Sequence, residues 1–304
     1  VHKASIQPAT FISYNRMITG RITQYFEPLG LKLCEVTPQV LDEFQEKILL
    51  EGYTTNTVIH YHAIFGKAFK DAVRKDYLET NPMLKVDRPK KNSFRPNFYS
   101  KDEVQQLLEV SQDDPLHLCI LITAYYGLRR SEVLGLKWSS IDFERKSITI
   151  NHKVTEQLVN GKYVPVVSDV MKNKTSCRTL PLIPEMEDYL RRLRQEQREN
   201  QLLMGPGYVR NDFVCKWPDG LPFRPDVVSR GFRRLLKRHH LPDIRFHDLR
   251  HSCASLLLSS GADVKSVQEI LGHADASTTL NFYVKTDLKQ MRNATEKYAK
   301  AFGL

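Results

Sequence analysis

Apolar residues recur every three or four positions along the first part of the chain, a spacing that predicts amphipathic helices. The clearest stripe joins Val58, Phe65 and Ala72, and Gly52 is suited to end the helix that precedes it. The pattern therefore predicts a helical N-terminal region. Its helices are expected over residues 8–26, 38–51, 54–76 and, for a single turn, 77–81.

This periodicity stops at residues 87–98, where prolines and basic residues replace the apolar positions. Such a composition is typical of an extended linker between domains. Beyond it, Ser100 and Glu103 form a capping-box pattern that predicts the start of a helix. An apolar run that stops at Gly127 predicts another helix. We therefore expect a second domain after the linker.

The second domain also contains stretches that predict a small antiparallel sheet. Residues 147–150 and 178–182 are the expected strands, and Asn160-Gly161 between them is a turn signal for an inserted hairpin at about 152–170. The predicted fold is mainly α with a small antiparallel β-sheet: a helical domain, then a mixed α/β domain. Further helices are expected over residues 184–200, 225–240, 247–259, 263–271, 276–283 and 287–300.

The chain is basic, with 45 Lys and Arg against 35 Asp and Glu and a formal net charge of +10. Basic residues are in excess both in residues 1–95, with 14 against 10, and in the remainder, with 31 against 25, so the charge is not confined to a tail. This distribution favours a polyanionic partner, and an ordinary, mildly basic soluble protein is the alternative. The five cysteines include no Cys-x-x-Cys pair, which argues against a disulfide framework and fits a reducing compartment. The apolar runs are too short to span a bilayer.

The last quarter of the chain holds residues that suit phosphate chemistry. His247 and Arg250 lie three positions apart on a predicted helix and share a face, and arginine can grip a phosphate with two parallel hydrogen bonds. His273 follows a helix end, and Tyr283 comes ten residues later. A phenol beside cations and a base can act as a nucleophile. A helix cap at His273 and a core aromatic at Tyr283 are the structural alternatives.

Two upstream segments can add charge to this set. Arg129 follows Gly127, the expected end of a helix, and Glu132 is close enough to orient it through a charge-assisted hydrogen bond. A lysine-rich turn contains Lys172 and Lys174. Both segments therefore contribute candidate site residues.

A zinc site is the alternative interpretation of the histidines. His247 and His251 have the i, i+4 spacing of a zinc-binding helix, and His273 is a potential third ligand. However, Asp248 stands where the metalloprotease motif has glutamate, and Arg250 would place a cation beside the metal. We therefore do not expect a zinc site.

Five short motifs follow one another in order: Gly-Leu-Arg-Arg-Ser-Glu from Gly127, a lysine before Arg-Thr-Leu-Pro-Leu at 178–182, His-Asp-Leu-Arg-His-Ser from His247, Leu-Gly-His ending at His273, and Tyr283. Their order resembles the tyrosine recombinase (phage integrase) family over about residues 100–285. The helical pattern of residues 1–85 is similar to that family's core-binding domain. The long hairpin and lysine-rich return strand resemble the integrases of conjugative transposons.

The resemblance implies a nucleophile and a phosphate clamp. Tyr283 is expected to attack the scissile phosphate, which yields a 3′-phosphotyrosyl DNA intermediate and a free 5′-hydroxyl. Arg129 and Arg250 are expected to hold the non-bridging oxygens as negative charge grows on them. Glu132 is expected to support this clamp.

The resemblance also implies the proton-transfer groups. Lys172 is expected to protonate the leaving 5′-oxygen, with Lys174 as the alternative because the alignment is ambiguous by two residues. His247 is expected to accept the tyrosine proton or to hold the phosphate. His273 is expected to donate another hydrogen bond to the phosphate.

The family's organisation implies four parts of the chain. These are a core-binding domain at 1–86, the linker at 87–98, a catalytic domain at 99–285, and a tail helix at 286–304 that contacts a neighbouring subunit. Packing of the tail on its own domain is the alternative. The two domains are expected to form a clamp around DNA. An arm-binding domain before Val1 is usual in such integrases, although the sequence leaves this open.

The implied function is site-specific DNA recombination for the excision and integration of a mobile element, without ATP, metal or another cofactor. The implied partners are double-stranded DNA at transposon or attachment sites and a homo-tetramer on DNA, with accessory excision or DNA-bending proteins as further candidates. A bacterial, cytoplasmic, DNA-associated location is expected. Two other classes are the alternatives: a type IB topoisomerase, which shares the chemistry but acts as a monomer, and a non-catalytic DNA-binding regulator.

Overall fold

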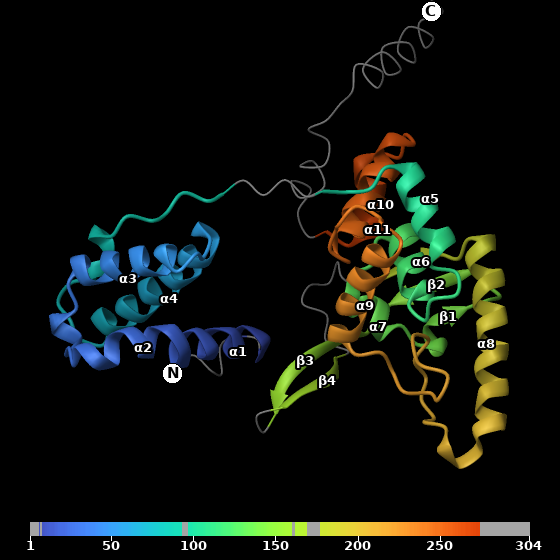
Figure 1. Ribbon diagram of the computed structural model, residues 1–304, viewed down its shortest axis with the longest axis horizontal. Helices are drawn as coiled ribbons and strands as arrows, with labels where there is room; N and C mark the ends of the chain where they lie inside the picture. The colour runs from blue at the N-terminus through green and yellow to red at the C-terminus, as the bar shows by residue number, and fades with distance from the viewer. Residues whose placement is uncertain (1–5, 7, 93–96, 160–161, 169–176, 274–304) are drawn as a thin grey trace, which may run out of the picture. The chain divides into compact units, whose positions relative to one another are not determined.

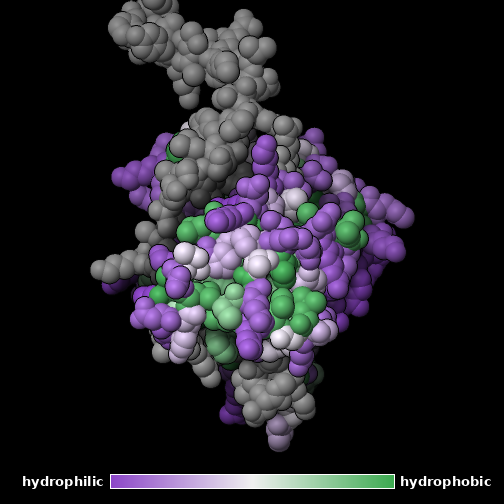
Figure 2. Space-filling view, turned by 90° about the vertical axis from the view of Figure 1, so that its left-hand side faces the viewer, coloured by the Kyte–Doolittle hydropathy of each residue, from purple (hydrophilic) through white to green (hydrophobic). Residues whose placement is uncertain are grey.

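The computed structural model describes residues 6, 8–92, 97–159, 162–168 and 177–273 (Figure 1). The chain divides into two compact units, Val1–Arg95 and Pro96–Leu304. The predicted linker at 87–98 spans this division. Hydrophilic side chains are interspersed with small apolar areas on the face shown in Figure 2, as is normal for a protein surface.

The N-terminal unit is a group of helices around an aromatic core. Phe44 of one helix contacts the rings of Tyr61 and Phe65 of another edge-on, with ring centroids 5.4 Å apart in both pairs. Thr37 and Thr54 accept backbone hydrogen bonds and begin the two longest helices. The helices are α1 (Pro8–Met17), α2 (Thr23–Phe26), α3 (Pro38–Leu50) and α4 (Thr55–Arg74).

Two predictions for this unit need correction. The expected helix 8–26 is interrupted by a π-helical turn at Ile18–Ile22, where Gly20 has non-helical dihedral angles. The prediction of a short helix at 77–81 is wrong. A 3-10 helix forms at Pro82–Lys85 instead, because the Asn81 side chain caps it and proline suits its first position.

The C-terminal unit is mainly helical. Helix α6 is buried over most of its surface, which explains why its sequence is apolar all round. Helix α10 packs against both α6 and α11. The Ser100–Glu103 capping box is present at the start of α5. The helices are α5 (Lys101–Val110), α6 (His117–Tyr126), α7 (Arg130–Gly135), α8 (Pro184–Met204), α9 (Pro225–Arg238), α10 (Asp248–Ser259) and α11 (Val264–Leu271).

The same unit contains a three-stranded antiparallel sheet of order β1-β2-β5. Strands β3 and β4 form a separate antiparallel hairpin that projects from the unit (Figure 1). The strands are β1 (Ile141–Asp142), β2 (Ser147–Ile150), β3 (Lys153–Val159), β4 (Lys162–Ser168) and β5 (Arg178–Pro181). The predicted fold class, mainly α with a small antiparallel sheet, is confirmed, as is the inserted hairpin. None of the described helices has the length and apolar character needed to cross a membrane.

Candidate active site

Arg129 lies at the junction between helices α6 and α7. Gly127 ends α6 in the left-handed conformation (φ 60°), and Arg129 then occupies the position before the first residue of α7. Its backbone N–H donates to Glu132 Oε2 (3.0 Å), and its Nη1 donates to Glu132 Oε1 (2.7 Å). The predicted contact with Glu132 is therefore present. The side chain is about one-third exposed and reaches a cavity.

Arg250 comes from helix α10 and lies against this junction. Its side chain is only 2% exposed, and Nη1 donates to the Gly127 carbonyl oxygen (2.7 Å). Nη2 is buried and has no hydrogen-bond partner among the described residues. Burial, and then the neighbouring charge of Arg129, lower the pKa of Arg250 to about 9, so it stays protonated at neutral pH. A buried cation with a spare donor is suited to an anionic group.

His247 directly precedes helix α10 and lies at the rim of the cavity. Its imidazole is exposed on one side and meets the ring of His251 edge-on, at 5.1 Å between centroids. The protein packed around it, followed by the charges of His251 and Arg250, lowers its pKa, although solvent at the open side screens part of this effect. The neutral imidazole that results can accept a proton.

His273 follows Gly272, which ends helix α11 in the left-handed conformation (φ 65°). The side chain is 7% exposed. Burial, and then the charges of Arg250 and Arg129, lower its pKa to about 3. His273 is therefore neutral at neutral pH, and a neutral imidazole can still donate one hydrogen bond.

Glu132 connects these segments through its carboxylate, which is almost fully buried. Besides its two bonds from Arg129, it accepts one from Arg178 Nη2 (3.0 Å), and Arg129 Nη2 donates to the Gly272 carbonyl (3.1 Å). Burial alone favours the protonated carboxyl, but the charges and hydrogen bonds of Arg178 and Arg129 outweigh it and lower the pKa of Glu132. The carboxylate therefore stays ionised between two guanidinium groups.

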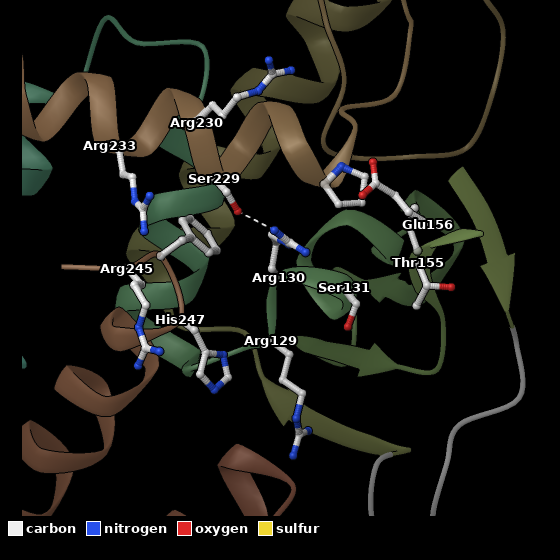
Figure 3. Close-up of a pocket in the computed structure, with 13 residues that line it drawn as sticks. Arg129, Arg130, Ser131, Thr155, Glu156, Ser229, Arg230, Arg233, Arg245 and His247 are labelled. Carbon is white, nitrogen blue, oxygen red and sulfur yellow. Dashed lines mark hydrogen bonds between the residues drawn. The ribbon is translucent and has the colours of Figure 1, made fainter. Parts of the chain in front are cut away.

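The cavity beside Arg129 has a volume of about 830 Å³ and is strongly basic (Figure 3). Arg129 and His247 extend to the same side of it, and Arg130 donates a hydrogen bond to Ser229 of α9. Five arginines and one acidic residue are among its lining side chains, a balance that attracts a polyanion. The lining residues are Arg129, Arg130, Ser131, Val154, Thr155, Glu156, Pro225, Ser229, Arg230, Arg233, Arg245, Phe246 and His247.

The structure thus brings together four of the six predicted catalytic residues: Arg129, His247, Arg250 and His273. Lys172, its alternative Lys174, and Tyr283 lie outside the described residues. Within the described part of the chain, no group of three or more His, Cys, Asp or Glu side chains is placed to hold a metal ion.

Sequence reasoning missed two features of the site. The acceptor of Arg250 is the backbone carbonyl of Gly127, which is 123 positions away and carries no side-chain signal. Arg178 was noted only as part of the return strand, yet it is 8% exposed and paired with Glu132. The sequence feature that could have indicated its role is its position directly after the lysine-rich turn.

Comparison with known proteins identifies the family. A model described as the phage integrase family matches residues 97–290, and one described as a phage integrase SAM-like domain matches residues 2–88. The chain is 28% identical to a tyrosine recombinase XerC-like protein of Caldanaerobacter subterraneus subsp. tengcongensis, over 97% of this chain and 79% of that protein. It is 26% identical to the ICEBs1 integrase of Bacillus subtilis, over 91% of this chain and 74% of the relative.

Solved structures share the fold. The integrase of transposon Tn1549, in complex with a circular intermediate DNA, has a TM-score of 0.79 at 21% identity, over 98% of this chain and 96% of the other. A lambda integrase dimer bound to a core site has a TM-score of 0.65 at 20% identity, over 90% of both chains. Because the family model spans most of its length, this chain belongs to the phage integrase family, the tyrosine-type site-specific DNA recombinases, as the order of its motifs predicted.

Proposed function

We propose that Tyr283 of this recombinase attacks the scissile phosphate of a DNA strand, and that Arg129 and Arg250 hold the two non-bridging oxygens. The observation that carries the proposal is the buried Nη2 of Arg250, which lacks a partner among the described residues and lies beside Arg129. Two guanidinium groups can neutralise the negative charge that grows on a phosphate during transfer.

The remaining residues account for the protons. His247 is neutral and accepts the phenolic proton of Tyr283 or holds the phosphate, and neutral His273 donates a hydrogen bond to it. The phosphorus–tyrosyl oxygen bond forms as the bond to the 5′-oxygen breaks. Lys172, or Lys174, gives that oxygen a proton, so one end of the cut strand carries a 3′-phosphotyrosine and the other end a 5′-hydroxyl. The ester keeps the bond energy, and attack by another 5′-hydroxyl reseals the backbone.

At the level of the whole protein, we propose a clamp on DNA that works as a tetramer in the excision and integration of a mobile element. Three observations on relatives support this: the Tn1549 integrase is bound to a circular intermediate DNA, lambda integrase occurs as a tetramer on a Holliday junction, and ICEBs1 integrase is among the relatives. The core-binding domain (1–86) and the catalytic domain (99–285) are the two parts of this clamp.

Covalent capture on DNA tests whether Tyr283 forms a phosphotyrosyl bond, and the same experiment identifies the DNA sequence that is cut. A library of nicked duplexes of randomised sequence is incubated with the protein in EDTA, and adducts that survive denaturation are recovered and sequenced. We expect adducts with the wild type and none with Tyr283→Phe, whereas Tyr189→Phe on α8 serves as the matched control. Arg250→Lys should slow adduct formation by about 100- to 1,000-fold. Absence of a wild-type adduct on every sequence refutes the proposal.

The recovered duplex then separates recombinase from topoisomerase. Joining of two labelled duplexes indicates strand exchange, whereas relaxation of supercoils without joining indicates a topoisomerase. The proposed subunit contact of residues 286–304 has its own test. Deletion of residues 287–304 should weaken assembly and strand exchange but preserve DNA binding by the monomer, and unchanged assembly contradicts the proposed subunit contact.

A further inference from the structure

Arg178 is a buried arginine to which the proposed reaction gives no role. It is the first residue of β5 and pairs with Ile150 of β2, so the sheet fixes its backbone. Its Nε donates to the Ile270 carbonyl (2.7 Å), and its Nη2 donates to Glu132 Oε2 (3.0 Å). One guanidinium thus joins the sheet, the last turn of α11 and the acidic residue of α7.

Both acceptors of Arg178, the Glu132 carboxylate and the Ile270 carbonyl, are linked to Arg129. Glu132 accepts from Arg178 and from Arg129, so the position of the carboxylate depends on both guanidinium groups. Ile270 lies two residues before Gly272, whose carbonyl accepts from Arg129 Nη2 (3.1 Å). Arg178 thus bonds to one acceptor of the Arg129 guanidinium, the Glu132 carboxylate, and to the turn of α11 that leads to the other, the Gly272 carbonyl.

The packing around Gly272 shows how closely Arg178 approaches the end of α11. A Cβ atom at Gly272 would lie 2.8 Å from Arg178 Nη1, and the positive φ of this glycine already disfavours other residues. His273 follows directly. The placement of both Arg129 and His273 is thus linked to the same buried guanidinium.

We infer that Arg178 is a positioning residue for strand cleavage: it orients Arg129, through Glu132 and the end of α11, toward the scissile phosphate. This inference rests on the proposed function of Arg129. It concerns orientation rather than contact with DNA. A small displacement of a group that stabilises the transition state lowers the rate steeply, even when substrate binding is unchanged.

The test measures single-turnover adduct formation at saturating DNA, on the duplex recovered by covalent capture. Arg178→Met should slow cleavage by about 10- to 100-fold with unchanged DNA affinity, and Arg178→Lys should restore part of the rate because it keeps the charge opposite Glu132. Arg191→Met is the matched control, since it removes the half-exposed Arg191 side chain from its pair with Glu187 on α8.

A neutral methylphosphonate at the scissile position distinguishes positioning from a general structural role. This substrate needs less charge from Arg129, so the defect of Arg178→Met should shrink on it. Equal defects on both substrates, an unchanged rate on the phosphodiester, or failure of both Arg178 variants to fold overturns the inference. If the wild type forms no adduct, the proposed function itself fails, which is a separate outcome.

Discussion

Replacing Glu132 with glutamine tests the arginine–carboxylate network through stability. Glu132→Gln keeps the shape of the side chain but removes its charge, while the 8%-exposed side chain of Arg178 stays buried and charged. Three hydrogen bonds reach the carboxylate, from Arg129 N (3.0 Å), Arg129 Nη1 (2.7 Å) and Arg178 Nη2 (3.0 Å). A glutamine amide accepts through one oxygen only, so its NH₂ group faces a cationic donor.

The expected loss is about 3 kcal/mol in the free energy of unfolding. Removal of one partner of a buried ion pair costs about 3–5 kcal/mol, because the other charge stays buried without compensation. The lower end of this range applies here, since Arg129 is about one-third exposed and solvent screens its charge.

Denaturant unfolding followed by tryptophan fluorescence measures this loss. The chain has two tryptophans, Trp138 and Trp217, and both lie in the C-terminal unit, so the signal reports on the unit that contains the site. Glu187→Gln is the control, since its partner Arg191 is 53% exposed and solvent screens the pair, so we expect a much smaller loss than in Glu132→Gln. A loss below about 1 kcal/mol in Glu132→Gln would refute the network as the support of Arg129.

Three further predictions follow from the same geometry. Gly127→Ala should destabilise the C-terminal unit by about 1–3 kcal/mol more than Gly261→Ala, since a Cβ at Gly127 would lie 2.3 Å from Leu271 whereas Gly261 has open space; equal losses in the same unfolding assay contradict this. His273 has a folded-state pKa of about 3 against an ordinary 6.5, so its contribution to stability is complete above pH 6.5 and is lost as the pH falls toward 3. Between pH 7 and pH 5 the wild type should therefore lose more stability than His273→Gln, and parallel curves would rule this out. Shortening the hairpin at about 152–170 to a tight turn should impair DNA cleavage or synapsis, and unaltered recombination in a plasmid assay would exclude a role for it.

Sequence periodicity predicted most of the described elements because their causes are local. Apolar stripes, the Ser100 capping box and the Asn160-Gly161 turn signal all act within a few residues. Helix α7 escaped prediction because its six residues are too short to display a period. The error at 77–81 arose from a turn after α4, in which the Tyr77 N–H bonds back to the Ala72 carbonyl.

By itself, the sequence determined the helical character of the protein, its small sheet, its basic charge and the order of motifs that identifies the family. Only the tertiary structure decided which residues share the site. Arg250 meets a carbonyl 123 positions away, and Glu132 meets Arg178 across 46 positions. Local sequence preferences cannot predict such pairings, because the pairings form only when α10 packs on α6 and β5 pairs with β2. This packing buries both arginines, and a buried charged group needs hydrogen-bond partners.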